Sequence, residues 1–213
     1  MTPDFRANLK TKFAPVLRAS GFSGSGRTFR RLTGVVIQVV HVQGSSSGEA
    51  CCVNLGTHFT FLPTTLENPA DPQAIREPDC EFRWRLATPD DRGDHWWDYG
   101  YNEFVAERSV QHLVSTYEAF GVSALEEYRN FPAPFDRVTP DMVARGDLRL
   151  LPGAPTTIRT VLALARISLH CSRFGAARDF ANLGLSMLTE RGSPSSLLPK
   201  FRDLAEKLRQ TAG

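Results

Sequence analysis

The sequence predicts an α+β fold: a four-stranded antiparallel sheet flanked by helices, followed by a C-terminal helical hairpin and a capping helix. Three observations support this class. Residues 34–61 form two β-prone runs joined by a Gly-Ser-rich loop. Apolar residues recur at helical spacing near the N-terminus and again over 103–120. From Thr156 onward the apolar spacing is helical throughout, which indicates a second, purely helical part.

The first predicted helix begins after the capping residue Thr2 and ends at Gly21. Pro15 removes one backbone hydrogen bond, so we expect a kink in its last turn. One face is apolar through four residues: Phe5, Leu9, Phe13 and Val16. The glycines after it do not form a phosphate-binding loop, because such a loop follows a strand and opens a helix.

The first predicted strand, 27–31, turns at Gly34. A three-residue loop places Phe29 opposite Ile37, whereas a two-residue loop would bury the Gln38 amide against the Phe29 ring. We therefore favour the three-residue loop.

In the central hairpin, closure of the 44–48 loop pairs His41 with Cys51 and Ile37 with Leu55. Side chains alternate along a strand, so this pairing defines two faces. The predicted core face contains seven residues: Val35, Ile37, Val39, Cys51, Val53, Leu55 and Phe59. The opposite face is half polar and contains Val36, Gln38, Val40, Val42, Asn54 and His58.

The fourth predicted strand, 80–87, also alternates. Its apolar side chains Cys80, Phe82, Trp84 and Leu86 should join the core face. Its charged side chains Glu81, Arg83 and Arg85 should therefore join the half-polar face.

A long helix is predicted over 103–120, ended by Gly121, with a capping box at Ser123 and Glu126 opening a short helix. The C-terminal helices are predicted at 156–171, 176–190 and 194–209, the second one capped by Gly192. They resemble a single tetratricopeptide-type unit. Because one unit makes no solenoid groove, we interpret them as packing elements rather than as a peptide receptor.

We predict two domains, an α+β domain over 1–135 and a helical extension over 136–213 packed on it. The 25 basic and 23 acidic residues nearly balance, which gives no footprint for nucleic acid or for a membrane surface. The N-terminus lacks the apolar segment of a secretory signal. Four irregularly spaced cysteines are not a disulfide framework, which favours the cytoplasm. Oligomeric state is not predictable from these features.

The order of several short motifs resembles a bacterial family, the domain of unknown function 4304. These motifs are Gly21-Phe22, Thr28-Phe29-Arg30, His41-Val42-Gln43-Gly44-Ser45, Asn54-Leu55-Gly56, Phe82-Arg83-Trp84-Arg85-Leu86 and Trp96-Trp97. The resemblance covers roughly residues 5–131. It implies an α+β fold and no catalytic residues. Domains of this size often accompany bacterial toxins as immunity proteins.

No catalytic residue, metal site or cofactor is predicted. His41, Cys51 and Cys52 form the densest chemical cluster, but adjacent cysteines on a strand diverge, so both cannot easily ligate one zinc ion. A Cys51 nucleophile activated by His41 would lie in mid-sheet rather than at a cleft. We therefore interpret these residues as core packing.

Two surfaces are candidate binding sites. The half-polar sheet face would join Gln38, Asn54, His58, Arg83 and Arg85, and its two arginines suit an anionic ligand or an acidic protein. The loop with Trp96 and Trp97 suits a basic partner, because acidic residues surround its aromatic rings. For the sheet face, the alternative is a solvated surface without a ligand. For the loop, the alternative is that one tryptophan fills the core while its neighbour covers the sheet edge.

The sequence thus predicts a non-catalytic binding protein, immunity-like, that engages a protein partner through either surface. The alternative is an enzyme or a small-molecule-binding protein with a site near His58, Arg83 and Arg85.

Overall fold

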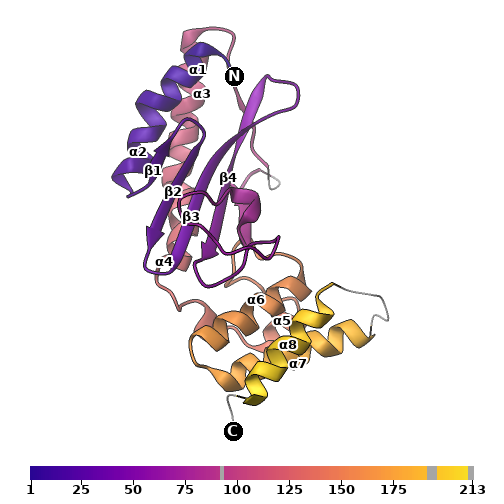
Figure 1. Ribbon diagram of the computed structural model, residues 1–213. Helices are drawn as coiled ribbons and strands as arrows, with labels where there is room; N and C mark the ends of the chain where they lie inside the picture. Colours follow the sequence, from indigo (N-terminus) through magenta and orange to yellow (C-terminus); the bar gives the residue numbers. More distant parts are fainter. Residues whose placement is uncertain (92–93, 191–195, 211–213) are drawn as a thin grey trace. The chain divides into compact units, whose positions relative to one another are not determined.

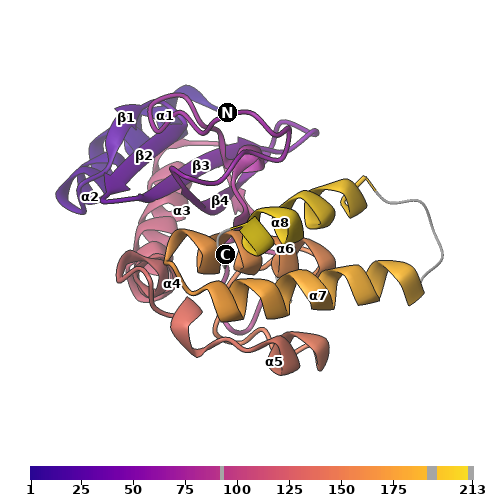
Figure 2. The same ribbon diagram turned by 60° about the horizontal axis from the view of Figure 1, so that its bottom comes forward.

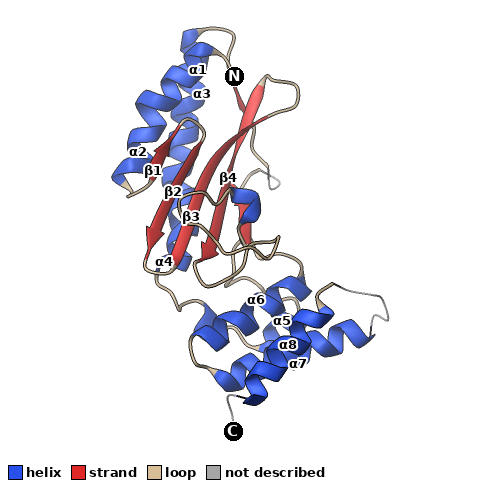
Figure 3. Cartoon of the chain, in the orientation of Figure 1, coloured by secondary structure: helices blue, strands red, loops and turns tan. Residues whose placement is uncertain are grey.

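The computed structural model describes residues 1–91, 94–190 and 196–210. Contacts divide the chain into two compact units, Met1–Arg129 and Asn130–Gly213. The predicted domain boundary after residue 135 and the packing of the second part on the first stay predictions. Figure 3 shows that all strands belong to the first unit and that the second is helical.

The first unit contains a six-stranded antiparallel sheet in the described residues, which confirms the α+β class. The strands are β1 (Ser23–Ser25), β2 (Thr28–Thr33), β3 (Val36–Gly44), β4 (Ala50–Phe59), β5 (Phe82–Arg85) and β6 (Trp97–Asp98). They run in the order β1-β2-β3-β4-β5, and β6 pairs with β4. The prediction of four strands missed β1 and β6, which have only three and two residues and therefore little periodicity.

Helices cover one face of this sheet (Figure 1). They are α1 (Pro3–Asn8), η1 (Leu9–Phe13), α2 (Ala14–Ala19), α3 (Glu103–Thr116), η3 (Tyr117–Gly121) and α4 (Val122–Arg129). The core between helices and sheet contains Phe5, Leu9, Phe13 and Leu17 from the first helix and Val40, Val42, Val53 and Leu55 from the sheet. We call this the helix-covered face.

The other face is covered in part by the segment between β4 and β5. That segment contains the short η2 (Glu77–Asp79) and lies in front of β3 and β4 in Figure 1. A smaller apolar cluster forms there from Ile37, Val39, Ile75 and Cys80.

The predicted register of β2 against β3 is wrong. Phe29 lies opposite Val40, rather than Ile37 or Gln38, and the turn has two residues, Gly34 and Val35. Gly34 adopts a φ of 57°, which suits such a turn.

The register of the central hairpin is also wrong, by three residues. His41 pairs with Asn54 and Ile37 with His58. An odd shift exchanges the faces of one strand relative to the other. Val40 and Val42 therefore lie with Val53 on the helix-covered face, whereas Ile37 and Val39, predicted to be core with it, lie on the opposite face.

The two long helical segments each contain a π-helical turn. In the first, the Ala14 N–H bonds to the Leu9 carbonyl immediately before Pro15, the residue at which the sequence predicts a kink. In the second, η3 continues α3 into α4, so Gly121 does not stop the helix as predicted. The capping box is also absent, because the Ser123 hydroxyl donates to the Phe120 carbonyl.

The second unit contains η4 (Phe135–Arg137), α5 (Pro140–Ala144), α6 (Thr157–His170), α7 (Phe174–Glu190) and α8 (Leu198–Gln210). Helices α6 and α7 form the predicted hairpin, and α8 packs on α7 (Figure 2). At Gly184 of α7, an added Cβ would overlap the Phe201 ring of α8, so only a residue without a side chain fits there. The predicted cap at Gly192 and start at Pro194 lie outside the described residues. Among those residues, no helix combines the length and apolar composition needed to cross a membrane.

Candidate functional site

Arg31 carries a buried guanidinium group in the first unit. It lies on β2, next but one to Phe29, and its side chain is 7% exposed. Its Nε donates to Gln38 Oε1 (2.8 Å), its Nη1 to the Ser20 carbonyl (2.7 Å) and its Nη2 to Glu126 Oε1 (3.0 Å). The guanidinium also stacks 4.7 Å from the centroid of the Phe22 ring. Arg31 thus joins the sheet to the end of α2 and to α4.

Two further side chains extend this network along α4. The Gln38 amide donates to the Leu125 carbonyl at 2.5 Å. Glu126 also accepts from Arg129 Nη1, at 3.2 Å to each carboxylate oxygen. Two guanidinium groups therefore share one carboxylate.

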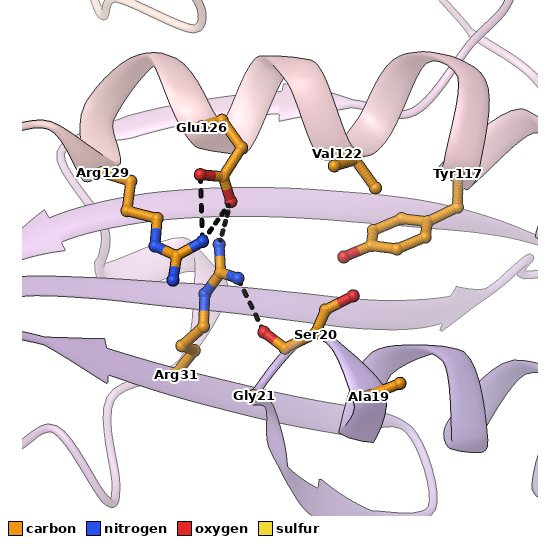
Figure 4. Close-up of a pocket in the computed structure, with 8 residues that line it drawn as sticks. All are labelled: Ala19, Ser20, Gly21, Arg31, Tyr117, Val122, Glu126 and Arg129. Atoms are coloured by element: carbon orange, nitrogen blue, oxygen red, sulfur yellow. Dashed lines mark hydrogen bonds and ion pairs between the residues drawn. The ribbon is translucent and has the colours of Figure 1, made fainter.

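These groups line a pocket of about 430 Å³ (Figure 4). Its lining residues are Ala19, Ser20, Gly21, Arg31, Tyr117, Val122, Glu126 and Arg129. Burial raises the pKa of Tyr117 to about 12, against the opposing effects of Arg31 and of a hydrogen bond with Ser20. The phenol therefore remains protonated at neutral pH, and the two arginines and one glutamate leave one net positive charge.

Two backbone segments with unusual geometry form opposite walls of this pocket. Gly21 ends α2 with a φ of 84°, a conformation that glycine adopts without strain, and so directs the Ser20 carbonyl towards Arg31. On the opposite wall, η3 supplies Tyr117. Short π-helical segments frequently occur at functional sites.

This pocket is not among the sites predicted from the sequence. One signal was available: Arg31 lies two residues after Phe29, so strand alternation puts a charged residue on a core face. The assignment of Glu126 to a capping box concealed its partner.

The structure does not bring the five residues of the predicted polar face together. Gln38 faces α4 on the helix-covered side, because the register differs from the predicted one. Asn54, Arg83 and Arg85 lie on the opposite face, where β5 pairs with β4. Asn54 is buried and donates to Gln43 Oε1 at 2.6 Å.

His58 is fully buried on that opposite face, and both ring nitrogens are hydrogen-bonded. Nδ1 accepts from the Glu81 N–H and Nε2 lies 3.1 Å from the Leu62 carbonyl, so the Nε2–H tautomer fits both partners. Arg83 pairs with the buried Glu77 at 2.6 Å, and Arg85 pairs with Asp94 at 2.5 Å.

The two tryptophans of the second candidate surface have different environments. Trp97 is buried, and its indole N–H donates to His112 Nδ1 at 3.1 Å. Trp96 is 41% exposed, and the Arg85 guanidinium lies 5.4 Å from its ring centroid. Trp96 and Arg85 are therefore the accessible part of this surface.

The predicted pairing of His41 with Cys51 is wrong. His41 lies opposite Asn54, and its Nδ1 is 2.8 Å from the Thr28 hydroxyl. Cys51 lies in the helix-covered core, where burial raises the pKa of its thiol to about 12. A thiol in that environment is a poor nucleophile.

Fold and site together define a class of protein: an antiparallel sheet covered on one face by two long helical segments, with an arginine-lined pocket between sheet and helices. The chain belongs to the family described as Domain of unknown function (DUF4304), whose model matches residues 13–127, just over half of the chain. All pocket residues except Arg129 lie in the matched region. No curated protein and no solved structure matches the chain.

Proposed function

We propose that this protein is a non-catalytic binding protein and that the Arg31 pocket receives a small organic anion. The observation that carries the proposal is the arrangement of Arg31 and Arg129 around Glu126 in a pocket of about 430 Å³. Ligand pockets commonly have volumes of about 300–1,000 Å³.

The lining supports recognition of a carboxylate or phosphate group. Guanidinium groups bind such anions in bidentate geometry. Three of the five N–H groups of Arg31 have partners among the described residues, and Nη1 and Nη2 each retain one more. Ala19 and Val122 offer apolar surface to the rest of the ligand. The protonated Tyr117 can donate or accept a hydrogen bond, but it is not a base.

The test is a titration of the full chain with benzoate and with inorganic phosphate, followed by NMR or calorimetry. We expect Arg129→Gln to weaken binding roughly tenfold, since a hydrogen bond to a charged group is lost. Arg129 is 47% exposed, so its replacement should leave the fold intact. Arg108→Gln, an exposed substitution on α3, is the matched control. Equal binding by both variants, or no binding of either anion, would refute the proposal.

A protein partner is the second candidate, and one observation favours it. Trp96 and Arg85 form an exposed pair, and tryptophan and arginine are frequent in interface hot spots. Asp94 forms an ion pair with Arg85, and the exposed Asp98 follows Trp96 by two residues. These acids suit a basic partner and an immunity-like role against a nucleic-acid-binding toxin.

Capture from lysate with Trp96→Ala, compared with Tyr101→Ala, tests this candidate. Tyr101 is 90% exposed and serves as an aromatic control. A basic protein that the parent and Tyr101→Ala retain, and that Trp96→Ala loses, is the expected result. Retention by all three proteins would count against the Trp96 surface.

We place this function in the cytoplasm of a bacterium. The cysteines Cys51, Cys52, Cys80 and Cys171 are free thiols, which suits a reducing compartment. The alternative is an enzyme or ligand site near His58, Arg83 and Arg85. It gains little support, because both ring nitrogens of His58 already form hydrogen bonds within the protein.

A further inference from the structure

A second cationic surface lies in the second unit, on helices α7 and α8. The two helices enclose a groove of about 540 Å³ lined by Arg178, Asn182, Leu185, Arg202, Ala205, Glu206 and Arg209. Three arginines and one glutamate give it two net positive charges. All three arginines are exposed, and none has an ion pair within the described part of the chain.

The helices run in opposite directions, which orders the groove (Figure 2). Gly184 packs on Phe201, so the neighbouring Leu185 lies near Arg202. Counting back along α7 and forward along α8 places Arg178 towards Arg209. One end of the groove therefore carries two arginines, and the other carries one arginine beside an apolar side chain.

The length of the groove indicates what it can hold. Arg202 and Arg209 are seven residues apart on α8, which corresponds to roughly 10 Å at the helical rise. An extended peptide covers that distance with about three residues. A single phosphate or carboxylate group reaches only one end, whereas a peptide with spaced carboxylates can meet both ends. Between its carboxylates, an aliphatic side chain can contact the half-buried Leu185 and Ala205.

We propose that the α7–α8 groove docks an acidic peptide segment of a partner protein. Charge complementarity carries the choice of occupant, because three unpaired guanidinium groups surround a groove with a single carboxylate. The site is separate from the Arg31 pocket and does not depend on the function proposed for it. It also revises our interpretation of the C-terminal helices as packing elements alone.

The experiment measures fluorescence anisotropy of a labelled peptide, Glu-Leu-Glu-Leu-Glu, titrated with the full chain. A Lys-Leu-Lys-Leu-Lys peptide is the charge-reversed control. We expect the chain to bind the acidic peptide and not the lysine peptide. Added salt should weaken this binding, because the charges are exposed. The double variant Arg202→Gln/Arg209→Gln should weaken binding by about tenfold, since each exposed ion pair contributes modestly.

Arg145→Gln is the matched control, since Arg145 is exposed in the same unit but lies outside the groove. Circular dichroism of each variant checks that the helices remain folded. Three results would overturn the proposal: no binding of the acidic peptide, equal binding of the lysine peptide, or unchanged binding by the folded double variant. Displacement of the peptide by inorganic phosphate at matched ionic strength would assign the groove to a small anion instead.

Discussion

Replacement of Arg31 by methionine should destabilise the first unit by about 3 kcal/mol. The largest contribution comes from Gln38 Oε1, which is buried and would lose its donor, at a cost of about 1–3 kcal/mol. The partly buried Ser20 carbonyl adds roughly 1 kcal/mol. Glu126 adds less than about 0.5 kcal/mol, because it is 35% exposed and keeps Arg129 as a partner.

The assay is urea denaturation followed by tryptophan fluorescence. The three tryptophans of the chain, Trp84, Trp96 and Trp97, all lie in the first unit, so the signal reports the unfolding of that unit. Arg129→Met is the control, because Arg129 pairs with the same glutamate but is 47% exposed, and it should cost less than about 0.5 kcal/mol.

A double variant separates the buried hydrogen bond from the other effects. Gln38→Leu in the Arg31→Met background removes both partners, so it should cost less than the sum of the two single substitutions by about 1 kcal/mol. The free energies of unfolding of Arg31→Met and Arg129→Met decide the question. If Arg31→Met lowers this free energy no more than Arg129→Met does, the buried hydrogen bonds of Arg31 do not stabilise the packing of α2 and α4 on the sheet.

Further predictions concern packing, pH and thiol chemistry. Gly184→Ala should destabilise the second unit by about 1–3 kcal/mol in a calorimetric scan, because its Cβ would overlap the ring packed on it. Gly175→Ala, with open space around its Cβ, should show no such loss. Burial lowers the pKa of His41, so the unfolded chain binds that proton more readily and stability falls as the pH drops below 6.5. His41→Gln should flatten that part of a pH series of urea midpoints, and an unchanged slope would exclude His41 as its source. Because burial raises the pKa of Cys51 to about 12, a disulfide reagent at about pH 8 should label the partly exposed Cys171 first, and equal labelling rates would contradict the buried position.

Helices were the most predictable part of this fold, because their apolar faces recur within a single segment. Of the stripe that the spacing predicts, Ala106, Val110, Leu113 and Tyr117 are buried. Phe120, the fifth predicted member, is 38% exposed, because it lies in the π-helical turn, where the helical spacing changes. Strand pairing was not predictable in the same way. The Gly-Ser-rich loop allows several closures, and a shift of three residues exchanged the faces of β3 relative to β4. For that reason Gln38 lies on the other face from Asn54, His58, Arg83 and Arg85, which still share one face of the sheet.

The candidate pocket could not be assembled from the sequence. Arg31 and Glu126 are 95 residues apart, and their contact depends on both the sheet register and the path of α4. The sequence could show only that a charge occupied a core position on β2. Family membership, in contrast, was predicted from the order of several short motifs, and the family model matches residues 13–127.

Because of the π-helical turn at Tyr117–Gly121, we expect the α3–α4 helix to tolerate the loss of one residue. Gly121 in this turn is buried, whereas the neighbouring Phe120 is 38% exposed. A wide turn accommodates one residue more than a regular turn, so deletion of Phe120 should restore regular α-helix while Glu126 still faces Arg31. Deletion of Val110 from the regular part should instead rotate the segment after it out of position. A Phe120 deletion that unfolds the first unit as readily as the Val110 deletion would show that the extra residue is required.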